Sequence, residues 1–488
     1  MKTRTVETSG PLERYPLEPG AEEMRRLVQE AMDRIVPHIL SLPEQPAADV
    51  EGAVDLARSL AEPLPLEGRP FPELLDLLFE RAIPKSFNAA SPGYLAYIPG
   101  GGLFHTAVAD LIADAVNRYT GVFAAAPALS QLEANVVAWF AEIFGYPRES
   151  RGILTSGGSL ATLTALVTAR RERLPENFLN GTLYVSDQTH HAVEKSALLA
   201  GFPPRNVREI PSDEAFRIRL DALEQRIEED RRQGFLPFLV VGNAGTTNTG
   251  AVDPLDELAA VALRQGLWLH VDAAYGGFFL LTEEGRRLMR GIERSDSVVL
   301  DPHKGLFLPY GTGALLVRDG EALRRAHSVP AEYLPPMQED SDLVDFNEIS
   351  PELSKPYRGL RVWLPLKLLG IGPFAEALEE KMELARWAAE ELRALPGIEI
   401  LAEPQVTVVA FRWNPGGIEA GRLDDLNRLN RRFLDRINAR RRVMLTPTML
   451  GGLFALRICV VSFRTHRDRV EAALEDIRAA LVEMEGER

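Results

Sequence analysis

Apolar positions near the N-terminus recur every three to four residues. Residues 20–40 place apolar side chains at helical spacing, and the same pattern returns over residues 71–83, after Pro70. Proline-rich segments separate the two stretches. Helices of this kind offer one apolar face and little core of their own. We therefore predict that residues 1–103 form a helical N-terminal arm that packs on another chain or domain.

After residue 103 short apolar runs alternate with amphipathic segments such as residues 220–232 and 255–263. Continuous apolar strands separated by helices are typical of a mostly parallel sheet with helices on both faces. We predict that residues 104–361 form a large α/β domain with such a doubly wound sheet. Its strands are expected at residues 152–155, 182–185, 238–241, 267–272, 297–300 and 313–317.

The pattern changes twice more toward the C-terminus. Residues 324–358 are rich in Pro, Glu, Asp and Ser without clear periodicity, which predicts a long loop. Residues 362–488 then mix helical and strand periods, which predicts a small α+β domain. Its expected elements are a helix at 373–395, strands at 406–412 and 456–462, and a helix from residue 468.

Composition narrows the possible partners. The formal net charge is −15, which argues against nucleic acid as the main partner. Cys459 is the single cysteine, so neither an intrachain disulfide nor a cysteine-rich metal site is possible, and we expect no metal. The N-terminus lacks an apolar signal segment, and no apolar run approaches the ~18 residues of a membrane span. We expect a cytoplasmic protein that binds neither membranes nor nucleic acid.

Two predicted strands end in residues of complementary chemistry. Lys304 follows the run 297–300 directly behind His303, and Asp272 ends the run 267–272. The carboxyl ends of parallel strands meet at one edge of a sheet, where ligands bind. A desolvated lysine amine condenses with aldehydes, and a carboxylate keeps a pyridine nitrogen protonated. A lysine taken alone is usually a solvated surface residue, but this pair is what pyridoxal phosphate requires.

A glycine-rich turn, Thr155–Ser159, separates a predicted strand from the predicted helix at residues 160–173. Glycines let backbone N–H groups approach a phosphate, and the N-terminus of a helix favours negative charge. Such a turn alone is more often an ordinary loop. Together with Lys304 and Asp272 it predicts a phosphate-binding site.

Three further residues follow strand ends. An imidazole at His190 could stack on the cofactor ring, although the adjacent His191 leaves the choice between the two open. Thr246 could hydrogen-bond the cofactor, and His303 is placed to touch its phosphate or ring. Each is an ordinary loop residue when taken singly.

Three of these segments, residues 186–194, 270–276 and 301–304, resemble the group II pyridoxal-phosphate decarboxylases, and most closely the aromatic L-amino-acid decarboxylases. The resemblance runs from residues 92–99 to 456–465 and so covers nearly the whole chain. It implies the fold-type I transferase fold. It also implies a homodimer with its active sites at the subunit interface.

The resemblance also assigns roles. Lys304 would bind the cofactor aldehyde, Asp272 would pair with the pyridine nitrogen, and His190 would stack on the ring and help to position the substrate carboxylate. Tyr333, in the predicted loop, would protonate the carbon that loses CO₂. The implied cofactor-binding residues are Gly157, Gly158, Ser159, His190, Thr246, Asp272, Ala274, His303 and Lys304. The implied substrate pocket comprises Tyr97, Ile98, Pro99, Tyr119, Gly121, Tyr310 and Ser354.

Several positions depart from the animal aromatic decarboxylases. Gly305 stands where Trp is usual, and Asp301 stands where Asn lies near the phosphate, so that two anions would repel. Ser354 matches a position where plant relatives tend to carry Ser for phenolic and Gly for indolic substrates. We predict decarboxylation of an aromatic L-amino acid, in the class of tyrosine, DOPA, tryptophan and phenylalanine, to its arylalkylamine and CO₂.

Two alternatives stay open. One is decarboxylation-dependent oxidative deamination to an aldehyde, and Tyr333 argues against it because relatives that make aldehydes often carry Phe there. The other is decarboxylation of an acidic amino acid such as glutamate or aspartate. A catalytically inactive binding protein would not be expected to keep Lys304, Asp272, His190 and Tyr333 together.

Overall fold

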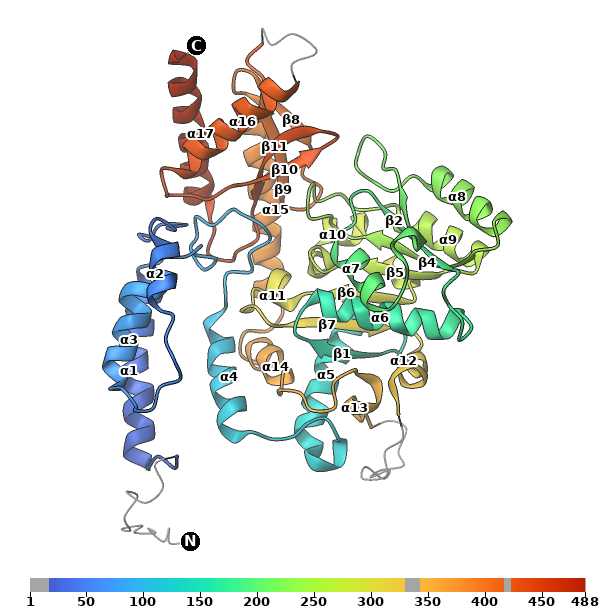
Figure 1. Ribbon diagram of the computed structural model, residues 1–488, viewed down its shortest axis with the longest axis horizontal. Helices are drawn as coiled ribbons and strands as arrows, with labels where there is room; N and C mark the ends of the chain where they lie inside the picture. The colour runs from blue at the N-terminus through green and yellow to red at the C-terminus, as the bar shows by residue number, and fades with distance from the viewer. Residues whose placement is uncertain (1–16, 330–342, 417–422, 488) are drawn as a thin grey trace. The chain divides into compact units, whose positions relative to one another are not determined.

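The computed structural model describes residues 17–329, 343–416 and 423–487. The contacts divide the chain into two units, residues 1–88 and 89–488. The first unit contains α1 (Ala21–Leu40), α2 (Ala53–Ser59), α3 (Phe71–Asp76) and a π-helical turn, Leu77–Ala82 (Figure 1). α1 has no buried residue within this chain, as expected for an arm with little core of its own. The division predicted at residues 103 and 361 remains a prediction.

The second unit contains a seven-stranded sheet in the order β1-β7-β6-β5-β4-β2-β3. β2, β3, β4, β5 and β6 run parallel to one another, whereas β7 is antiparallel to both β1 and β6. The strands are β1 (Arg151–Thr155), β2 (Gly181–Ser186), β3 (Val207–Ile210), β4 (Leu236–Asn243), β5 (Trp268–Asp272), β6 (Ser297–Leu300) and β7 (Gly313–Val317). The mostly parallel sheet is confirmed, and β3 is the one strand of this sheet that the periodicity missed.

Side chains of successive strand residues enter two separate cores, one on each face of the sheet. One core joins Leu239 and Val241 of β4 to α6, α7 and α12, while the other joins Val240 of β4 to α5, α8 and α9. Because side chains alternate across a strand, a wholly apolar strand requires cover on both sides. The helices of these layers are α5 (Pro127–Ile143), α6 (Gly158–Arg173), α7 (Ala192–Leu199), α8 (Leu220–Arg232), α9 (Leu255–Gln265) and α12 (Gly320–His327) (Figure 1).

A second sheet of four antiparallel strands, in the order β10-β11-β9-β8, lies in the C-terminal part of the chain. Sequence reasoning found β9 and β11 but not β8 and β10. The elements of this part are α15 (Gly372–Arg393), β8 (Ile398–Ala402), β9 (Val408–Trp413), α16 (Leu423–Asn438), β10 (Thr446–Leu450), β11 (Leu453–Cys459) and α17 (Arg467–Gly486). The remaining helices of this unit are α4 (Phe104–Val116), α10 (Glu283–Leu288), α11 (Pro302–Gly305), α13 (Phe346–Ile349) and α14 (Gly359–Leu369).

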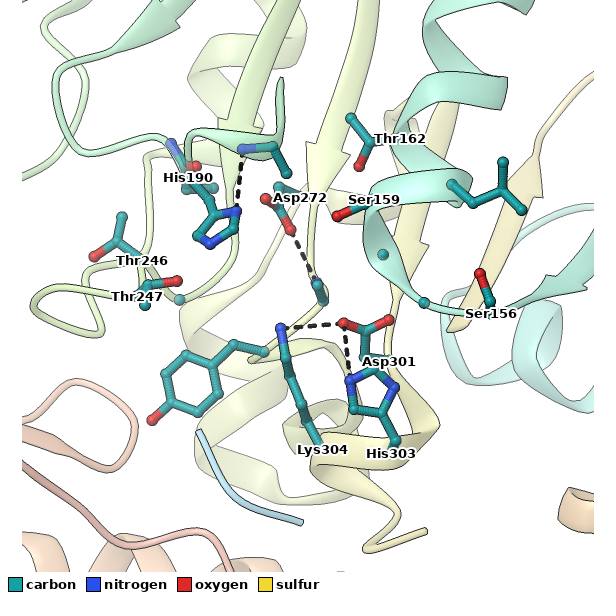
Figure 2. Close-up of a pocket in the computed structure, with 18 residues that line it drawn as sticks. Ser156, Ser159, Thr162, His190, Thr246, Thr247, Asp272, Asp301, His303 and Lys304 are labelled. Carbon is teal, nitrogen blue, oxygen red and sulfur yellow. Dashed lines mark hydrogen bonds and ion pairs between the residues drawn. The ribbon is translucent and has the colours of Figure 1, made fainter. Parts of the chain in front are cut away.

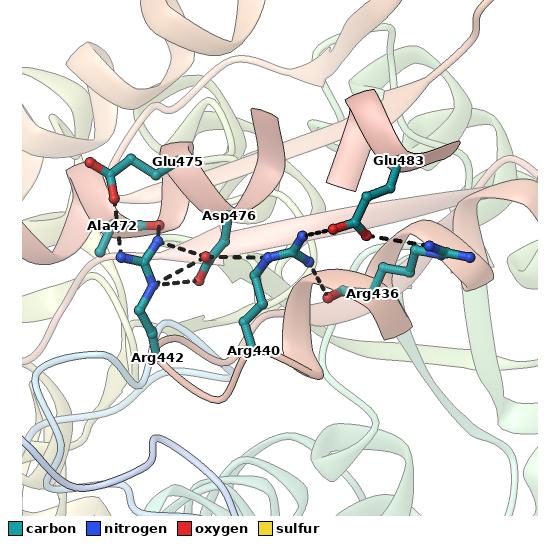
Figure 3. A network of polar contacts seen from close by, with 7 residues as sticks. All are labelled: Arg436, Arg440, Arg442, Ala472, Glu475, Asp476 and Glu483. Carbon is teal, nitrogen blue, oxygen red and sulfur yellow. Dashed lines mark hydrogen bonds and ion pairs between the residues drawn. The ribbon is translucent and has the colours of Figure 1, made fainter. Parts of the chain in front are cut away.

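Arginines after and within α16 tie this region to α17 (Figure 3). Asp476 is 2% exposed and pairs with Arg442, at 2.7 Å, and with Arg440, at 3.7 Å. The Arg442 side chain is 48% exposed, so solvent screens its charge and the pair contributes less than a fully buried one would. The backbone beside Arg442 in turn holds the strand-like segment before the predicted substrate pocket, since Met444 N–H donates to the Gly93 carbonyl at 3.0 Å.

The predicted long loop, residues 324–358, is partly helical. α12 extends to His327 and α13 spans Phe346–Ile349. Both helical stretches are too short within this segment to produce a recognisable periodicity, so sequence reasoning missed them. Residues 330–342, including Tyr333, lie outside the described residues. Beyond them, Lys355 forms a buried ion pair with Glu133 of α5. Among the described residues no helix is both long and apolar enough to cross a membrane.

Candidate active site

A cavity of about 320 Å³ lies at the carboxyl ends of the parallel strands (Figure 2). Each residue predicted to bind the cofactor contributes to its wall, from five separate stretches of the chain. These residues are Gly157, Gly158, Ser159, His190, Thr246, Asp272, Ala274, His303 and Lys304. The parallel topology explains the convergence, because all of these stretches follow strand ends.

Lys304 lies on the short helix α11, which starts one residue after Asp301. Its Nζ is 3.1 Å from Asp301 Oδ2, and the two side chains are 21% and 4% exposed. His303 Nδ1 donates to the Thr312 carbonyl at 2.6 Å, which leaves Nε2 on the side of Asp301, at 3.7 Å. Burial lowers the pKa of His303. The lysine amine therefore reaches the cavity within a group of ionisable side chains.

Asp272 is the last residue of β5, opposite Asn243 of β4 in the register of the sheet. Its Oδ1 accepts a hydrogen bond from the Ala274 N–H at 3.1 Å. The carboxylate faces the same space as the ring of His190 and the amine of Lys304 (Figure 2). It is thus placed to meet a cationic group in the cavity.

His190 has a defined tautomer. Its Nδ1 accepts from the Ala192 N–H at 3.2 Å, so the neutral ring carries its proton on Nε2. Burial lowers the pKa of His190, and the charge of Asp272 opposes that effect. The structure favours His190 over His191 as the cavity residue, because His191 does not line the cavity.

The turn before His190 is anchored by buried polar groups. Thr189 Oγ1 accepts from the Ser186 N–H at 3.0 Å, and Asn243 Nδ2 lies 3.2 Å from that same oxygen. Asn243 in turn donates to Asp253 Oδ2 through its side chain, at 2.8 Å, and through its backbone N–H, at 2.7 Å. Asp253 is therefore linked through Asn243 to the turn that presents His190.

The glycine-rich turn opens α6 into the cavity. A Cβ on Gly158 would lie 3.0 Å from Asp301 Oδ2, and one on Gly313 would lie 2.5 Å from the carbonyl carbon of Gly157. Side chains at either position would crowd the turn. The first N–H groups of α6 and the dipole of the helix make this end of the cavity suitable for an anion.

These residues fit pyridoxal phosphate. The cavity combines an amine for the aldehyde, a carboxylate for the pyridine nitrogen, and a helix N-terminus that glycines leave open for the phosphate. The carboxylate of Asp301 is harder to reconcile with a bound phosphate. Asp301 Oδ1 is buried and has no hydrogen-bond partner, and a carboxylate at this position faces the anion-binding end of the cavity.

The predicted substrate-pocket residues do not line this cavity. Tyr97 lies near Tyr94 with a ring separation of 6.5 Å, and its φ of 53° is an unusual backbone conformation for a non-glycine residue. The segment that carries Tyr97, Ile98 and Pro99 ends at Gly100, which packs directly against α11. A Cβ on Gly100 would overlap the His303 carbonyl oxygen, so only glycine allows this close approach. The Tyr310 ring lies 5.5 Å from that of His303. Tyr97, Ile98, Pro99 and Tyr310 are thus near the cavity rather than in its wall.

The other three predicted pocket residues lie together elsewhere. The Tyr119 hydroxyl donates to the carbonyl of Leu353, the residue before Ser354, at 2.9 Å. The Gly121 carbonyl accepts from the Asn347 N–H at 3.0 Å. The fold therefore joins two segments that are far apart in the sequence, but within one chain it does not bring them into the wall of the lysine cavity.

Sequence reasoning missed Arg457, on β11. This guanidinium is 4% exposed, and its Nε and Nη2 have no hydrogen-bond partner. Burial raises the pKa of Cys459 to about 12, and the charges of Arg457 and Lys304 both oppose that effect. Burial likewise raises the pKa of Tyr275, a residue of the cavity wall, against the charge of Arg457. A charged residue inside the apolar run 456–462 was the available signal.

Arg457 does not line the cavity, but half of the residues that do were also not predicted to bind the cofactor. Asp301 was noted only as a departure from the family pattern near the phosphate, and Asn243 was not singled out. The unpredicted lining residues are Ser156, Leu160, Thr162, Ala192, Asn243, Gly245, Thr247, Tyr275 and Asp301. Small and hydroxyl side chains in loops carry no pattern of their own, so only the fold identifies them.

Comparison with known proteins agrees with this geometry. Residues 73–414 match the pyridoxal-dependent decarboxylase conserved domain. The chain is 34% identical over 469 residues to an aromatic-L-amino-acid decarboxylase from Bacillus atrophaeus, covering 96% of this chain and 97% of that protein.

Two solved plant structures have the same fold. One is TDC from Oryza sativa with PLP and tryptamine, with a TM-score of 0.90, 27% identity, and coverage of 96% of this chain and 99% of that one. The other is tryptophan decarboxylase from Catharanthus roseus in complex with L-tryptophan, with a TM-score of 0.88, 28% identity and the same coverage. This chain therefore belongs to the pyridoxal-dependent decarboxylase family, and its cofactor is pyridoxal phosphate.

Proposed function

We propose that this protein decarboxylates an aromatic L-amino acid to the corresponding arylalkylamine and CO₂. The observation that carries the proposal is the cavity that unites Lys304, Asp272 and the N-terminus of α6. The relatives described above are named for aromatic substrates and match over almost the full length of the chain. The reaction class follows from the family, and the residue roles below are our inference.

The bound cofactor supplies an aldehyde that reacts with amines and a ring that accepts the electron pair left when CO₂ departs. Lys304 would hold the cofactor through its aldehyde, and Asp272 would keep the pyridine nitrogen protonated by placing a negative charge beside it. His190 donates from Nε2 into the cavity, because Nδ1 is already engaged by the Ala192 N–H.

Arg457 is our candidate for binding the substrate carboxylate. A buried guanidinium with two unused nitrogens is costly unless an anion meets it, and a carboxylate is the matching planar partner. Arg457 does not line the cavity itself, but its charge acts on Tyr275 of the cavity wall. Binding the carboxylate there would orient the substrate and so select which bond to the α-carbon breaks.

The product depends on Tyr333, which lies outside the described residues. A phenol that protonates the α-carbon gives the amine, whereas reaction of that carbon with O₂ gives an aldehyde, ammonia and peroxide. We predict that Tyr333→Phe keeps cofactor binding and CO₂ release but forms aldehyde and peroxide in place of amine. Product analysis by chromatography, with a peroxide assay, measures the ratio. Amine formation at the wild-type rate would assign the proton to another donor, with His190 next.

We also propose a homodimer that completes the substrate pocket. Tyr119, Gly121 and Ser354 lie together but outside the cavity of their own chain. α4 ends at Val116, shortly before Tyr119 and Gly121 in the sequence, and exposes an apolar stripe at helical spacing. The stripe comprises Val108, Leu111, Ile112 and Val116, which are 39–51% exposed. A second copy that covers this stripe could bring the Tyr119 group to the lysine cavity of its partner.

The function is tested by incubating the purified holoenzyme with each common amino acid and measuring CO₂, amine, aldehyde and peroxide. We expect amine and CO₂ from aromatic substrates, with tyrosine or DOPA ahead of tryptophan, because Ser354 can hydrogen-bond a ring hydroxyl. Turnover of glutamate or aspartate alone would overturn the aromatic assignment. Tryptophan as the fastest substrate would show that Ser354 does not select phenols.

A cytoplasmic location remains a prediction, and cell fractionation would test it.

A further inference from the structure

One acidic side chain of the cavity has no role in the chemistry above. Asp301 is 3% exposed, lines the cavity, and forms an ion pair with Lys304 at 3.1 Å. Its Oδ1 is buried without a hydrogen-bond partner. Asp272 already provides the carboxylate for the pyridine nitrogen. Asp301 is therefore a second carboxylate in a cavity that must also accept an anion.

The position of Asp301 places it at the phosphate end of the cavity. A Cβ built on Gly158, the first residue of α6, would lie 3.0 Å from Oδ2 and 3.3 Å from Oδ1. A Cβ on Gly313 of β7 would lie 2.9 Å from Oδ1. The carboxylate thus faces the turn whose N–H groups attract anions (Figure 2). A phosphate bound there lies beside it.

The ionisable groups around Asp301 change when the cofactor binds. Lys304 forms an ion pair with Asp301, and His303 Nε2 lies 3.7 Å from the Asp301 carboxylate. His190, in the turn before α7, is also close enough for the charge of Asp301 to act on its pKa. A Lys304 amine bound to the aldehyde is no longer a free ammonium partner for Asp301. A phosphate at the N-terminus of α6 would be a new anionic neighbour, and a nearby like charge favours the protonated form of a carboxyl group.

We propose that Asp301 takes up a proton from solvent when the phosphate of the cofactor binds at the N-terminus of α6. The resulting carboxyl O–H donates a hydrogen bond to a phosphate oxygen. This replaces a repulsion between two anions by a charge-assisted hydrogen bond. Loading of the cofactor is thereby linked to proton uptake, and the affinity contributed by Asp301 falls as pH rises. The inference concerns the cofactor and holds whichever amino acid is the substrate.

Isothermal titration calorimetry of the cofactor-free protein tests the linkage. Pyridoxal phosphate is titrated in buffers of different ionisation enthalpy, which gives the number of protons taken up per site. We expect wild type to take up close to one proton more than Asp301→Asn, which stays neutral and can donate through its amide. We also expect the dissociation constant of wild type to rise with pH by up to about tenfold per unit relative to that variant.

A matched control is Asp296→Asn, which alters a mostly buried carboxyl group at the opposite end of β6 and should leave both quantities at wild-type values. Far-ultraviolet circular dichroism confirms that each variant is folded. Equal proton counts and parallel pH profiles for wild type and Asp301→Asn would overturn the proposal. So would loss of cofactor binding in Asp301→Asn, because an ionised carboxylate would then be required.

Infrared difference spectroscopy tests separately whether a carboxyl group takes up the proton. The wild type alone answers that question, and the comparison with Asp301→Asn assigns the band to Asp301. Titration with inorganic phosphate or pyridoxal phosphate should produce the carbonyl stretching band of a protonated carboxylic acid. Such a band that is absent from Asp301→Asn supports the proposal. Proton uptake without that band would place the proton on His303 and overturn it.

Discussion

The individual residues of this site act through charges held in fixed positions. Asp272 is fixed by the end of β5 and by the Ala274 N–H, and His190 has its tautomer fixed by the Ala192 N–H. Preorganised charges contribute to catalysis because they need no rearrangement when charge develops in the reaction. Conservative substitutions at these positions should therefore alter rates far more than folding.

The first prediction at this scale is that Asp272→Asn folds and binds the cofactor but loses about 10²–10³-fold in kcat, in line with losing one preorganised partner of a developing charge. The amide leaves the pyridine nitrogen unprotonated. Steady-state kinetics and the visible absorbance of the bound cofactor measure the two effects. A kcat near that of wild type would refute the role of Asp272.

A second prediction concerns Arg457, whose two unused nitrogens are expected to meet the substrate carboxylate. Arg457→Gln should raise KM and lower kcat/KM by about 10- to 10²-fold, since a hydrogen bond to a charged group contributes ~1.5–3 kcal/mol. Cofactor affinity should change little. Arg412→Gln is a control on neighbouring β9, because Arg412 is already paired with Glu399 at 2.6 Å. Unchanged KM for Arg457→Gln would remove this residue from the substrate site.

At the scale of elements, buried polar groups link loops that are distant in the sequence. Asp253 accepts from the Ile218 N–H at 2.7 Å and from two donors on Asn243, and Asn243 reaches the turn that carries His190. All three donors are neutral. Burial raises the pKa of Asp253 to about 6. The loop after β4 is thus held to β2 by a carboxyl group whose ionised form is unfavourable in the folded chain.

This gives a prediction of pH dependence. The folded-state pKa of about 6 exceeds the ordinary value of 3.8, so the folded chain binds more protons between those values. The contribution of Asp253 to the free energy of unfolding should therefore fall, by up to ~3 kcal/mol, as pH rises from about 4 to about 6. Urea unfolding of the cofactor-free protein, compared with Asp253→Asn, isolates this term. The pH profile of the variant should lack it, and identical profiles would exclude it.

At the scale of the whole molecule, one chain brings the predicted cofactor-binding residues together but not the predicted substrate-pocket residues. The cofactor residues converge in one cavity, whereas Tyr119 and its neighbours at Leu353 lie outside it. The apolar stripe lies on α4, which ends shortly before Tyr119 in the sequence. If a second chain covered this stripe, the Tyr119 group of one chain could line the lysine cavity of the other.

We therefore predict that Leu111→Glu, in the middle of the stripe, yields a monomer that still binds pyridoxal phosphate but turns over slowly. A buried, unpaired charge at an interface costs several kcal/mol. Sedimentation velocity gives the mass, and absorbance and activity follow the two sites. The control is Leu263→Glu on α9, which alters a single leucine that is 78% exposed. A dimeric Leu111→Glu variant would show that this stripe is not the interface.

The sequence by itself determined the fold class and the chemistry of the cofactor site. Apolar strands with no polar face require helices on both sides, and their carboxyl ends then bring Lys304 and Asp272 to the same edge. Both conclusions depend on the local periodicity of apolar residues and on the alternation of strands and helices along the chain, and both can be read from the sequence. Strand-end positions also suggested His190 and Thr246, the family resemblance added Ala274, and all three line the cavity.

Only the tertiary structure decided where the polar groups find partners. No periodicity marks the short strand β3, the helix α13 within the predicted loop, or the antiparallel strand β10. The unused donors of Arg457 and the unpartnered oxygen of Asp301 are properties of their surroundings, set by segments far away in the sequence. A residue type and its neighbours in the chain predict local conformation, but burial and charge pairing depend on contacts that exist only once the chain has folded.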